Sequence, residues 1–141
     1  MMVFMDKGKK EFIYKVKIYY EDTDAGGIVY YANYLKFFER ARTELIYALG
    51  FNHKNLKEKD AQIIVRKFSI TYKKPAFFED ELIVKTFVEE IKGARIVMSQ
   101  TALKNDDVVT EATVELACVD QSGKPKQVPE ELKKSIEKLL N

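Results

Sequence analysis

Hydrophobic and polar residues alternate with a period of two in five separate stretches of the chain, which is typical of half-buried β-strands. In the first stretch, residues 14–20, Val16 and Ile18 share one face while lysines lie on the other. The same period returns four times in the second half, at residues 67–72, 82–87, 95–102 and 111–118. Two short polar breaks, Lys92-Gly93 and residues 105–107, suit hairpin turns, so we expect antiparallel neighbours.

Between Asn33 and Leu49 the period becomes that of an α-helix. One face carries the apolar side chains Tyr34, Phe38, Ala41, Leu45 and Ala48, with Leu35, Phe37 and Leu49 beside it. We expect Asn33 to be the N-cap and Gly50 to end the helix in the left-handed conformation. Residues 52–60 are then predicted to form a polar loop, and residues 130–140, after Pro129, a terminal amphipathic helix.

The order of these elements, one strand, one long helix, four strands and a tail helix, predicts an α+β fold. A wide apolar helix face needs a sheet to cover it. We therefore expect a curved antiparallel sheet wrapped around the long central helix, with the short C-terminal helix beside it. A chain of 141 residues suits one domain. We place this domain at residues 13–141 and predict that residues 1–12 form a flexible N-terminal segment.

Composition limits the classes of partner. Lys and Arg number 24 against 22 Asp and Glu, a net charge of +2, which does not indicate a nucleic-acid-binding protein. No apolar run approaches the roughly 20 residues that span a bilayer, so stable membrane insertion is not expected. The single cysteine, Cys118, fits a reducing compartment, and charges soon after Met5 interrupt any signal-peptide core. Together these features predict a cytoplasmic protein.

Several catalytic arrangements are absent from the sequence. His53 is the one histidine and no Gly-x-Ser-x-Gly motif accompanies it, so a surface or capping role is expected rather than a serine triad. Cys118 falls on the apolar phase of its strand, which is typical of a small core residue and not of a nucleophile. No cysteine and histidine cluster has the spacing of zinc ligands, and no glycine-rich phosphate loop occurs. We therefore predict no metal site.

Three carboxylates lie within four positions, at Glu21, Asp22 and Asp24, between the first strand and the long helix. They could form a solvated turn that bonds to nearby backbone amides or, with a substrate phosphate, hold a magnesium ion. The following residues favour a third interpretation. Gly26 and Gly27 allow close approach of the backbone, and the helix start behind them presents free N–H groups. A carboxylate facing such a helix start can attack a carbonyl whose developing oxyanion the N–H groups stabilise.

These residues also resemble a known family. Residues 20–34 read YEDTDAGGIVYYANY and residues 38–44 read FERARTE, and both are similar to the signature of hotdog-fold acyl-CoA thioesterases. The likeness is greatest to the YbgC-type branch of the 4-hydroxybenzoyl-CoA thioesterase family and extends from Tyr14 to about Pro129. It implies a hotdog fold, a sheet wrapped around one long helix, and hydrolysis of an acyl-CoA thioester to a carboxylic acid and free coenzyme A.

The resemblance also implies roles for individual residues. Asp24 would be the catalytic carboxylate, acting either as the nucleophile or as the general base on a water molecule. The backbone N–H of Tyr31, at the helix start, would polarise the thioester carbonyl, and Gly26 and Gly27 would be the other residues that bind the substrate or its oxyanion. Many members of the branch carry histidine where this chain has Tyr31. A role of the backbone survives that difference, whereas a role of the side chain does not.

Substrate, cofactor and assembly follow from the same resemblance. The thioester partner would be an acyl-CoA or an acyl-carrier protein, with coenzyme A part of the substrate and product and no bound cofactor. Hotdog proteins pair their sheets, so a homodimer is expected, doubled to a homotetramer through the outer sheet faces, with Asp24 near the dimer seam. A non-catalytic acyl-CoA or acyl-carrier-protein binding module and a hotdog hydratase or dehydratase are the alternatives. Five basic residues either contact the phosphates of coenzyme A or form a solvated sheet face: Arg66, Lys67, Lys73, Lys74 and Arg95.

Overall fold

The computed structural model describes residues 2–6 and 9–141. Six strands make the sheet: β1 (Met2–Asp6), β2 (Lys9–Lys17), β3 (Gln62–Tyr72), β4 (Glu81–Lys92), β5 (Arg95–Lys104) and β6 (Asp107–Val119). The helices are α1 (Asn33–Ala48), α2 (His53–Glu58) and α3 (Glu130–Glu137), and a single 3-10 turn, η1 (Tyr20–Asp22), follows β2.

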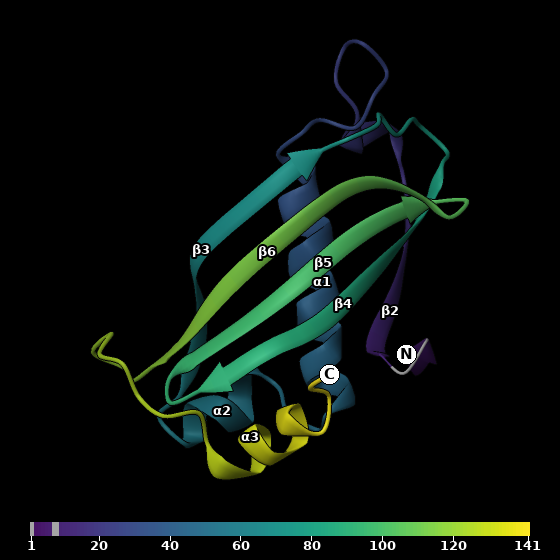
Figure 1. Ribbon diagram of the computed structural model, residues 1–141. Coiled ribbons are helices and arrows are strands. Elements are labelled where there is room, and N and C mark those ends of the chain that lie inside the picture. Colours follow the sequence, from purple (N-terminus) through teal and green to yellow (C-terminus); the bar gives the residue numbers. More distant parts are fainter. Residues whose placement is uncertain (1, 7–8) are drawn as a thin grey trace.

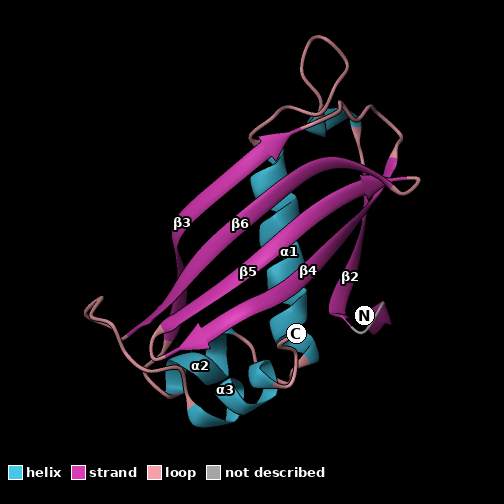
Figure 2. Ribbon diagram, in the orientation of Figure 1, coloured by secondary structure: helices cyan, strands magenta, loops and turns pink. Residues whose placement is uncertain are grey.

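One antiparallel sheet in the order β1-β2-β4-β5-β6-β3 curves across the long helix α1 (Figures 1 and 2). Two connections of the chain cross this sheet. After β2 the chain runs through α1 and α2 to the far edge, forms β3 there, and returns to place β4 beside β2. The expected sheet around one long helix is thereby confirmed, and the architecture is the hotdog fold.

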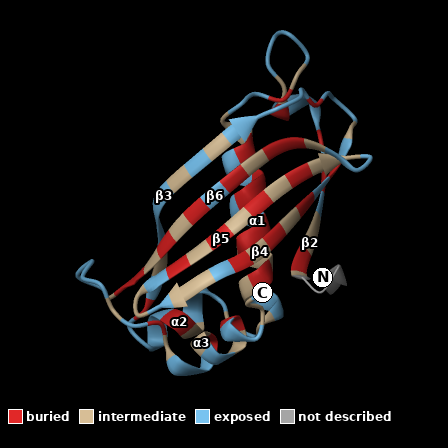
Figure 3. Ribbon diagram, viewed as in Figure 1, coloured by how far each residue is buried: buried red, intermediate tan, exposed pale blue. Residues whose placement is uncertain are grey.

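Burial alternates along the central strands, as the period of two predicts (Figure 3). Leu82, Val84 and Thr86 of β4 are almost inaccessible, whereas Ile83 between them is 39% exposed. Beside them, Val16 of β2 and Ile18, which directly follows β2, belong to the same core. Cys118 at the end of β6 is also inaccessible and lies in a hydrophobic cluster, so it is the core residue that the sequence predicts.

The helix α1 lays its apolar face on the sheet. Its buried apolar residues are Tyr34, Phe37, Phe38, Ala41 and Leu45. Ala48 and Leu35, which the sequence assigned to this face or its border, are exposed, while Phe37 is buried. Because the sheet curves around the helix, the covered stripe is displaced toward Phe37.

A polar group also crosses this core. The guanidinium of Arg42, on α1, donates to Gln100 Oε1 at 2.9 Å, and the Gln100 amide donates to Thr86 Oγ1 and to the Phe38 carbonyl. All these side chains are buried. Burial lowers the pKa of Arg42 from its ordinary value, which the neighbouring Glu39 partly opposes. Buried hydrogen bonds have strict geometry, so this network fixes how α1 lies on β4 and β5.

Turns and caps agree with the sequence at two places and differ at two. The β5–β6 hairpin turns at Asn105 and Asp106 with φ of 47° and 69°, and Gly50 ends α1 with φ of 90°, as expected. The N-cap of α1 is Ala32 and not Asn33, whose side chain bonds elsewhere. The predicted polar loop after α1 contains α2, because Asn52 and Asn55 cap each other's backbone and Leu56 is buried.

The N-terminal boundary differs from the prediction. Residues 1, 7 and 8 of the predicted flexible segment 1–12 lie outside the described residues. The other residues of that segment lie in β1 and β2, which pair with each other. Phe12 is only 2% exposed, because it faces the core opposite Thr86 of β4. The folded domain therefore begins before residue 13. None of the described helices is long and apolar enough to cross a membrane.

Candidate active site

Asp24 lies in the loop between η1 and α1, which projects beyond the end of the sheet (Figure 1). Its backbone N–H donates to the Ile28 carbonyl at 2.9 Å, and its carbonyl accepts from the Gly27 N–H at 3.0 Å. The carboxylate oxygen Oδ1 accepts from the Gly26 N–H at 2.9 Å. This is the local bond of an Asx turn. The second carboxylate oxygen remains available, and the residue is exposed.

Stereochemistry explains why two positions of the loop are glycine. A Cβ atom at Gly26 would lie 3.3 Å from Asp24 Oδ1, a tight contact against the carboxylate itself. Gly27 has a φ of 82°, which side chains rarely adopt. Gly26 and Gly27 therefore shape the turn that presents Asp24, and neither is among the residues that line the neighbouring groove.

Asp22 has a different environment from Asp24. It is buried, and its carboxylate accepts from the Tyr19 N–H and from Asn33 Nδ2, each at 2.9 Å. Its own carbonyl accepts from the Tyr30 N–H. Asp22, at the start of the loop, is thus bonded both to Tyr30 at its end and to Asn33, the first residue of α1. Among the described residues, no group of three or more His, Cys, Asp or Glu side chains could hold a metal ion together.

The loop is also attached to the sheet. The Val29 N–H donates to the Ala76 carbonyl at 2.9 Å, and Ile28 forms an isolated bridge with Phe77. Ala76 and Phe77 belong to the connection between β3 and β4. The segment between Asp24 and α1 is therefore held against this connection as well as against η1.

Tyr31 precedes α1 by two residues, and its side chain is 62% exposed. Within residues 2–6 and 9–141, no acceptor takes the backbone N–H of Tyr31. Such a free donor at a helix start, next to the positive end of the dipole, is suited to stabilise an oxyanion. The Tyr31 carbonyl, by contrast, accepts from the Tyr72 hydroxyl at 3.0 Å.

A groove of about 260 Å³ lies at this helix start. Three tyrosines from two elements form part of its wall: Tyr31 and Tyr34 at the start of α1, and Tyr72 at the end of β3. Ile28, Val29 and residues 73–75 complete it. Asp24 is not among these residues. The structure thus brings Tyr31 to a groove and leaves Asp24 on the adjoining loop, connected through Ile28.

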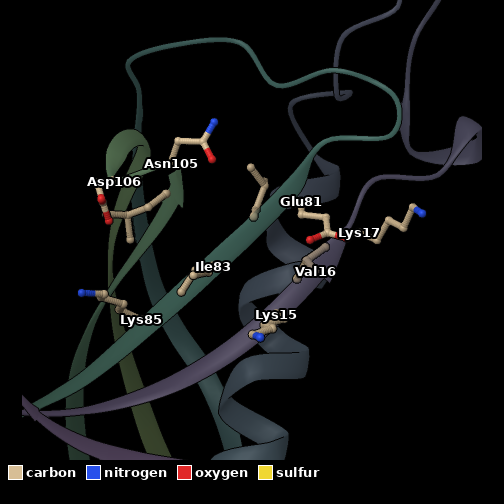
Figure 4. Close-up of a pocket in the computed structure, with 10 residues that line it drawn as sticks. Lys15, Val16, Lys17, Glu81, Ile83, Lys85, Asn105 and Asp106 are labelled. Carbon is tan, nitrogen blue, oxygen red and sulfur yellow. The ribbon is translucent and has the colours of Figure 1, made fainter.

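A cavity larger than this groove, about 410 Å³, lies elsewhere. Lys15 and Lys17 of β2, Lys85 of β4 and Asp106 of the β5–β6 turn are among the residues that line it (Figure 4). Its charges are mixed, and none of the predicted site residues lines it. Size therefore does not identify the site here, because this hollow lacks both the loop carboxylate and the helix start.

Four of the five basic residues considered for phosphate contact are paired with carboxylates. Glu115 of β6 forms salt bridges with both Arg66 and Arg95, at 3.6 and 3.0 Å. The remaining pairs are Arg95 with Glu90, Lys73 with Glu111, and Lys74 with Asp107. Such cross-strand pairs are typical of a solvated sheet face, although Lys73 and Lys74 also line the groove.

Sequence reasoning missed two residues near this site. Asn33 was expected to cap α1 but instead bonds to Asp22 through its side chain, and Tyr72 was expected only as part of a strand. The tyrosine at the end of a strand, just before two lysines and a proline, was the sole signal for Tyr72. His53, expected to cap or to lie on the surface, is the exposed first residue of α2. It does not line the groove beside Tyr31.

Comparison with known proteins gives consistent matches. Residues 19–136 match the thioesterase-like superfamily. The acyl-CoA thioesterase YbgC of Haemophilus influenzae is 44% identical over 130 residues, which cover 91% of this chain and 96% of that protein. The acyl-CoA thioester hydrolase YbgC of Escherichia coli is 38% identical and is covered to 92%, against 86% of this chain.

A solved structure agrees in fold. The crystal structure of a probable thioesterase from Bartonella henselae superposes with a TM-score of 0.81 at 35% identity. The match covers 84% of this chain and 99% of that one. The family match, residues 19–136, includes both the Asp24 loop and the start of α1.

Proposed function

This chain belongs to the thioesterase-like superfamily, and from that premise we propose that it hydrolyses acyl-CoA thioesters to a carboxylic acid and free coenzyme A. Relatives named acyl-CoA thioesterase or acyl-CoA thioester hydrolase are 38–44% identical over most of the chain and support the proposal. The observation that carries it is the Tyr31 N–H, a helix-start donor for which the described residues offer no acceptor, beside a groove and an exposed carboxylate loop.

Asp24 is the proposed catalytic carboxylate. As a nucleophile, it attacks the thioester carbonyl carbon, expels the coenzyme A thiolate and forms a mixed anhydride that water then hydrolyses. As a general base, it takes a proton from a water molecule whose oxygen attacks the same carbon; the carbon–sulfur bond then breaks, and the coenzyme A thiolate takes up that proton from Asp24 as it leaves. In both routes the bond of Asp24 Oδ1 to the Gly26 N–H leaves Oδ2 for the reaction.

The start of α1 supplies the second component. A tetrahedral intermediate develops negative charge on the former carbonyl oxygen, and backbone N–H groups fixed before the reaction stabilise that charge. The Tyr31 N–H is one such donor, and it lies next to the positive end of the α1 dipole. No side-chain donor is needed at this position.

The functional unit of the proposal is a homodimer. Among the described strands β3 pairs only with β6, so its other edge presents unpaired backbone groups. Ile64 and Val65 on this strand are 39% and 48% exposed. Pairing two copies along β3 would cover both, and the partner would close the groove on which Asp24 does not itself lie. A further doubling to a tetramer through the outer sheet faces is the accompanying proposal.

The cellular setting is part of the same proposal. A lone cysteine held as a free thiol fits a reducing compartment, so we assign the enzyme to the cytoplasm. There the acyl group arrives on coenzyme A or on an acyl-carrier protein, which present the same thioester to the site.

A thiol-release assay tests the proposed function. Purified protein is offered short, long and aromatic acyl-CoA thioesters and the matching acyl-carrier-protein thioesters, with Asp24→Asn as the control. Release by the wild type and its loss in Asp24→Asn support the proposal. Binding of the thioesters without thiol release indicates a binding module, and addition of water to an enoyl thioester indicates a hydratase.

A second measurement separates the two routes for Asp24. The wild type is mixed with a substrate labelled in its acyl group and quenched within one turnover. Label recovered on the peptide that contains Asp24 shows the mixed anhydride, whereas label found only in substrate and free acid shows the general-base route.

A further inference from the structure

The last residue of the edge strand β3 is bonded to the start of the helix. The hydroxyl of Tyr72 donates to the Tyr31 carbonyl at 3.0 Å, although the two residues are 41 positions apart. The Tyr72 ring packs edge-on against the rings of Tyr31 and Tyr34, with centroids 6.1 and 5.8 Å away. Tyr72 therefore contacts the Tyr31 main chain and the rings of Tyr31 and Tyr34, which line the groove with it.

The bond falls where the backbone is otherwise weakly held. The Tyr31 carbonyl also accepts from the Tyr34 N–H, but at 3.4 Å, which is long for a helical bond. Tyr31 itself precedes the regular helix. Without the Tyr72 hydroxyl, the Tyr31 main chain would be anchored on this side by that one long bond.

The peptide that Tyr72 holds adjoins two backbone donors. One donor is the Tyr31 N–H, on the N-terminal side of the Tyr31 Cα. The other is the Ala32 N–H, which belongs to the same peptide group as the Tyr31 carbonyl. In the part of the chain that the structure describes, neither N–H has an acceptor. A hydrogen bond to a carbonyl also polarises the N–H of the same peptide. Fixing this peptide therefore sets the direction of the first donor and strengthens the second.

The state of the hydroxyl suits a donor. Burial, together with the neighbouring Tyr31, raises the pKa of Tyr72 above its ordinary value. The phenol keeps its proton at neutral pH and can donate throughout the reaction.

We propose that Tyr72 is a positioning residue for the reaction, whose hydroxyl holds the Tyr31–Ala32 peptide so that the backbone N–H groups at the start of α1 meet the oxyanion. This inference rests on the proposed thioesterase function. Tyr72 acts through the backbone of another element and takes no proton from the substrate. Because it is the last residue of β3, it also makes the geometry of the donors depend on where that strand ends.

The test is Tyr72→Phe, which removes the hydroxyl and keeps the ring. The matched control is Tyr47→Phe, an exposed tyrosine at the other end of α1. We expect kcat to fall about tenfold in Tyr72→Phe with KM within about twofold, because the lost bond acts on the transition state. The shape of the pH profile should stay the same. The control should match the wild type in kcat and KM.

A structural measurement accompanies the kinetics. In a ¹⁵N-labelled sample, the amide signals of Tyr31 and Ala32 should shift in Tyr72→Phe and exchange faster with solvent. The signals of α2 should remain in place in the same spectrum. This measurement reports how firmly Tyr72 holds the Tyr31–Ala32 peptide, independently of catalytic activity.

Specific outcomes overturn the inference. An unchanged kcat in Tyr72→Phe, with an active wild type, overturns it and leaves the proposed function standing. A raised KM at constant kcat shows that the hydroxyl binds substrate instead, and loss of the alkaline limb of the profile shows that it transfers a proton. A wild type that releases no thiol from any thioester overturns the proposed function and this inference together.

Discussion

The side chain of Asn33, the first residue of α1, donates to the carboxylate of Asp22 across eleven positions of sequence at 2.9 Å. Asp22 ends η1 and is buried, so the bond joins the turn before the Asp24 loop directly to the helix after it. The loop is therefore closed at its base. The distance between Asp24 and the helix start is set by this closure as much as by the loop itself.

The Asp22–Asn33 bond should contribute measurably to stability. A hydrogen bond to a carboxylate contributes about 1.5–3 kcal/mol, and Asn33→Ala would also leave a buried oxygen without its partner. We expect urea unfolding of Asn33→Ala and Asp22→Asn to show losses of about 1–3 kcal/mol each. The double variant should lose less than the sum of the two. Additive losses would show that the two side chains do not act through each other.

Asp24→Asn should separate catalysis from folding. Asp24 is exposed, and asparagine can still accept from the Gly26 N–H, so we expect an unchanged melting temperature. Thiol release should fall at least about a hundredfold, the usual scale for loss of a positioned base or nucleophile. Asp22→Asn should lose less activity, because the Asp22 carboxylate accepts structural hydrogen bonds from the Tyr19 N–H and the Asn33 side chain. Equal losses at the two positions, with inhibition by a chelator, would contradict this and indicate a shared metal ion.

Tyr31→Phe should retain most of the activity. The substitution keeps the backbone N–H and the ring, and the Tyr31 hydroxyl lies on an exposed side chain. We expect kcat/KM within about threefold of the wild type, since the backbone donor is the group that stabilises the oxyanion. A collapse of kcat in this variant would show that the phenol itself takes part and would replace the backbone account.

Alkaline pH should weaken the fold through Tyr34. Burial, with smaller effects of Tyr72 and Asp80, raises the pKa of Tyr34 to about 12. In the unfolded chain the phenol ionises near its ordinary value of 10.0, so above that pH the unfolded state loses a proton that the folded state keeps. The free energy of unfolding should therefore fall by up to about 1.4 kcal/mol per pH unit between pH 10 and 12 from this residue.

Tyr34→Phe isolates this effect. It removes the ionising group and keeps the ring, so the stability advantage of the wild type over the variant should shrink as pH rises through that range. Urea unfolding at several pH values measures it. The exposed Tyr47 offers the control Tyr47→Phe, which should keep a constant difference from the wild type. A constant difference for Tyr34→Phe as well would show that Tyr34 ionises equally in both states.

Assembly along β3 should be visible by light scattering at low micromolar concentration. We expect a dimer or a tetramer for the wild type. Adjacent residues of a strand point to opposite faces, so Ile64→Lys combined with Val65→Lys charges both faces of the exposed edge strand and should yield monomers of low activity. Ile83→Lys, on the outer face of β4, should instead convert a tetramer to dimers. A fully active monomeric wild type would contradict the proposed assembly.

Much of the fold and part of the site followed from local patterns. The alternation in β4 and the helical period of α1 predict most of the buried side chains, because each reflects the geometry of its own backbone, although Ala48 at the end of α1 is exposed. The turn that presents Asp24 is local as well, since its carboxylate bonds to a residue two positions away. The short helix α2 was missed because its one buried residue, Leu56, leaves no period to detect.

The sequence by itself determined the long helix, the strands of the second half of the chain, the Asp24 loop and the free donor at the helix start, since all are properties of neighbouring residues. Only the tertiary structure decided that Tyr72 reaches Tyr31 and that Gln100 reaches Arg42, 41 and 58 positions away. These pairs depend on β3 crossing to the far edge and on α1 lying across the sheet. Such a choice comes from packing the whole chain into one core, and no local period records it.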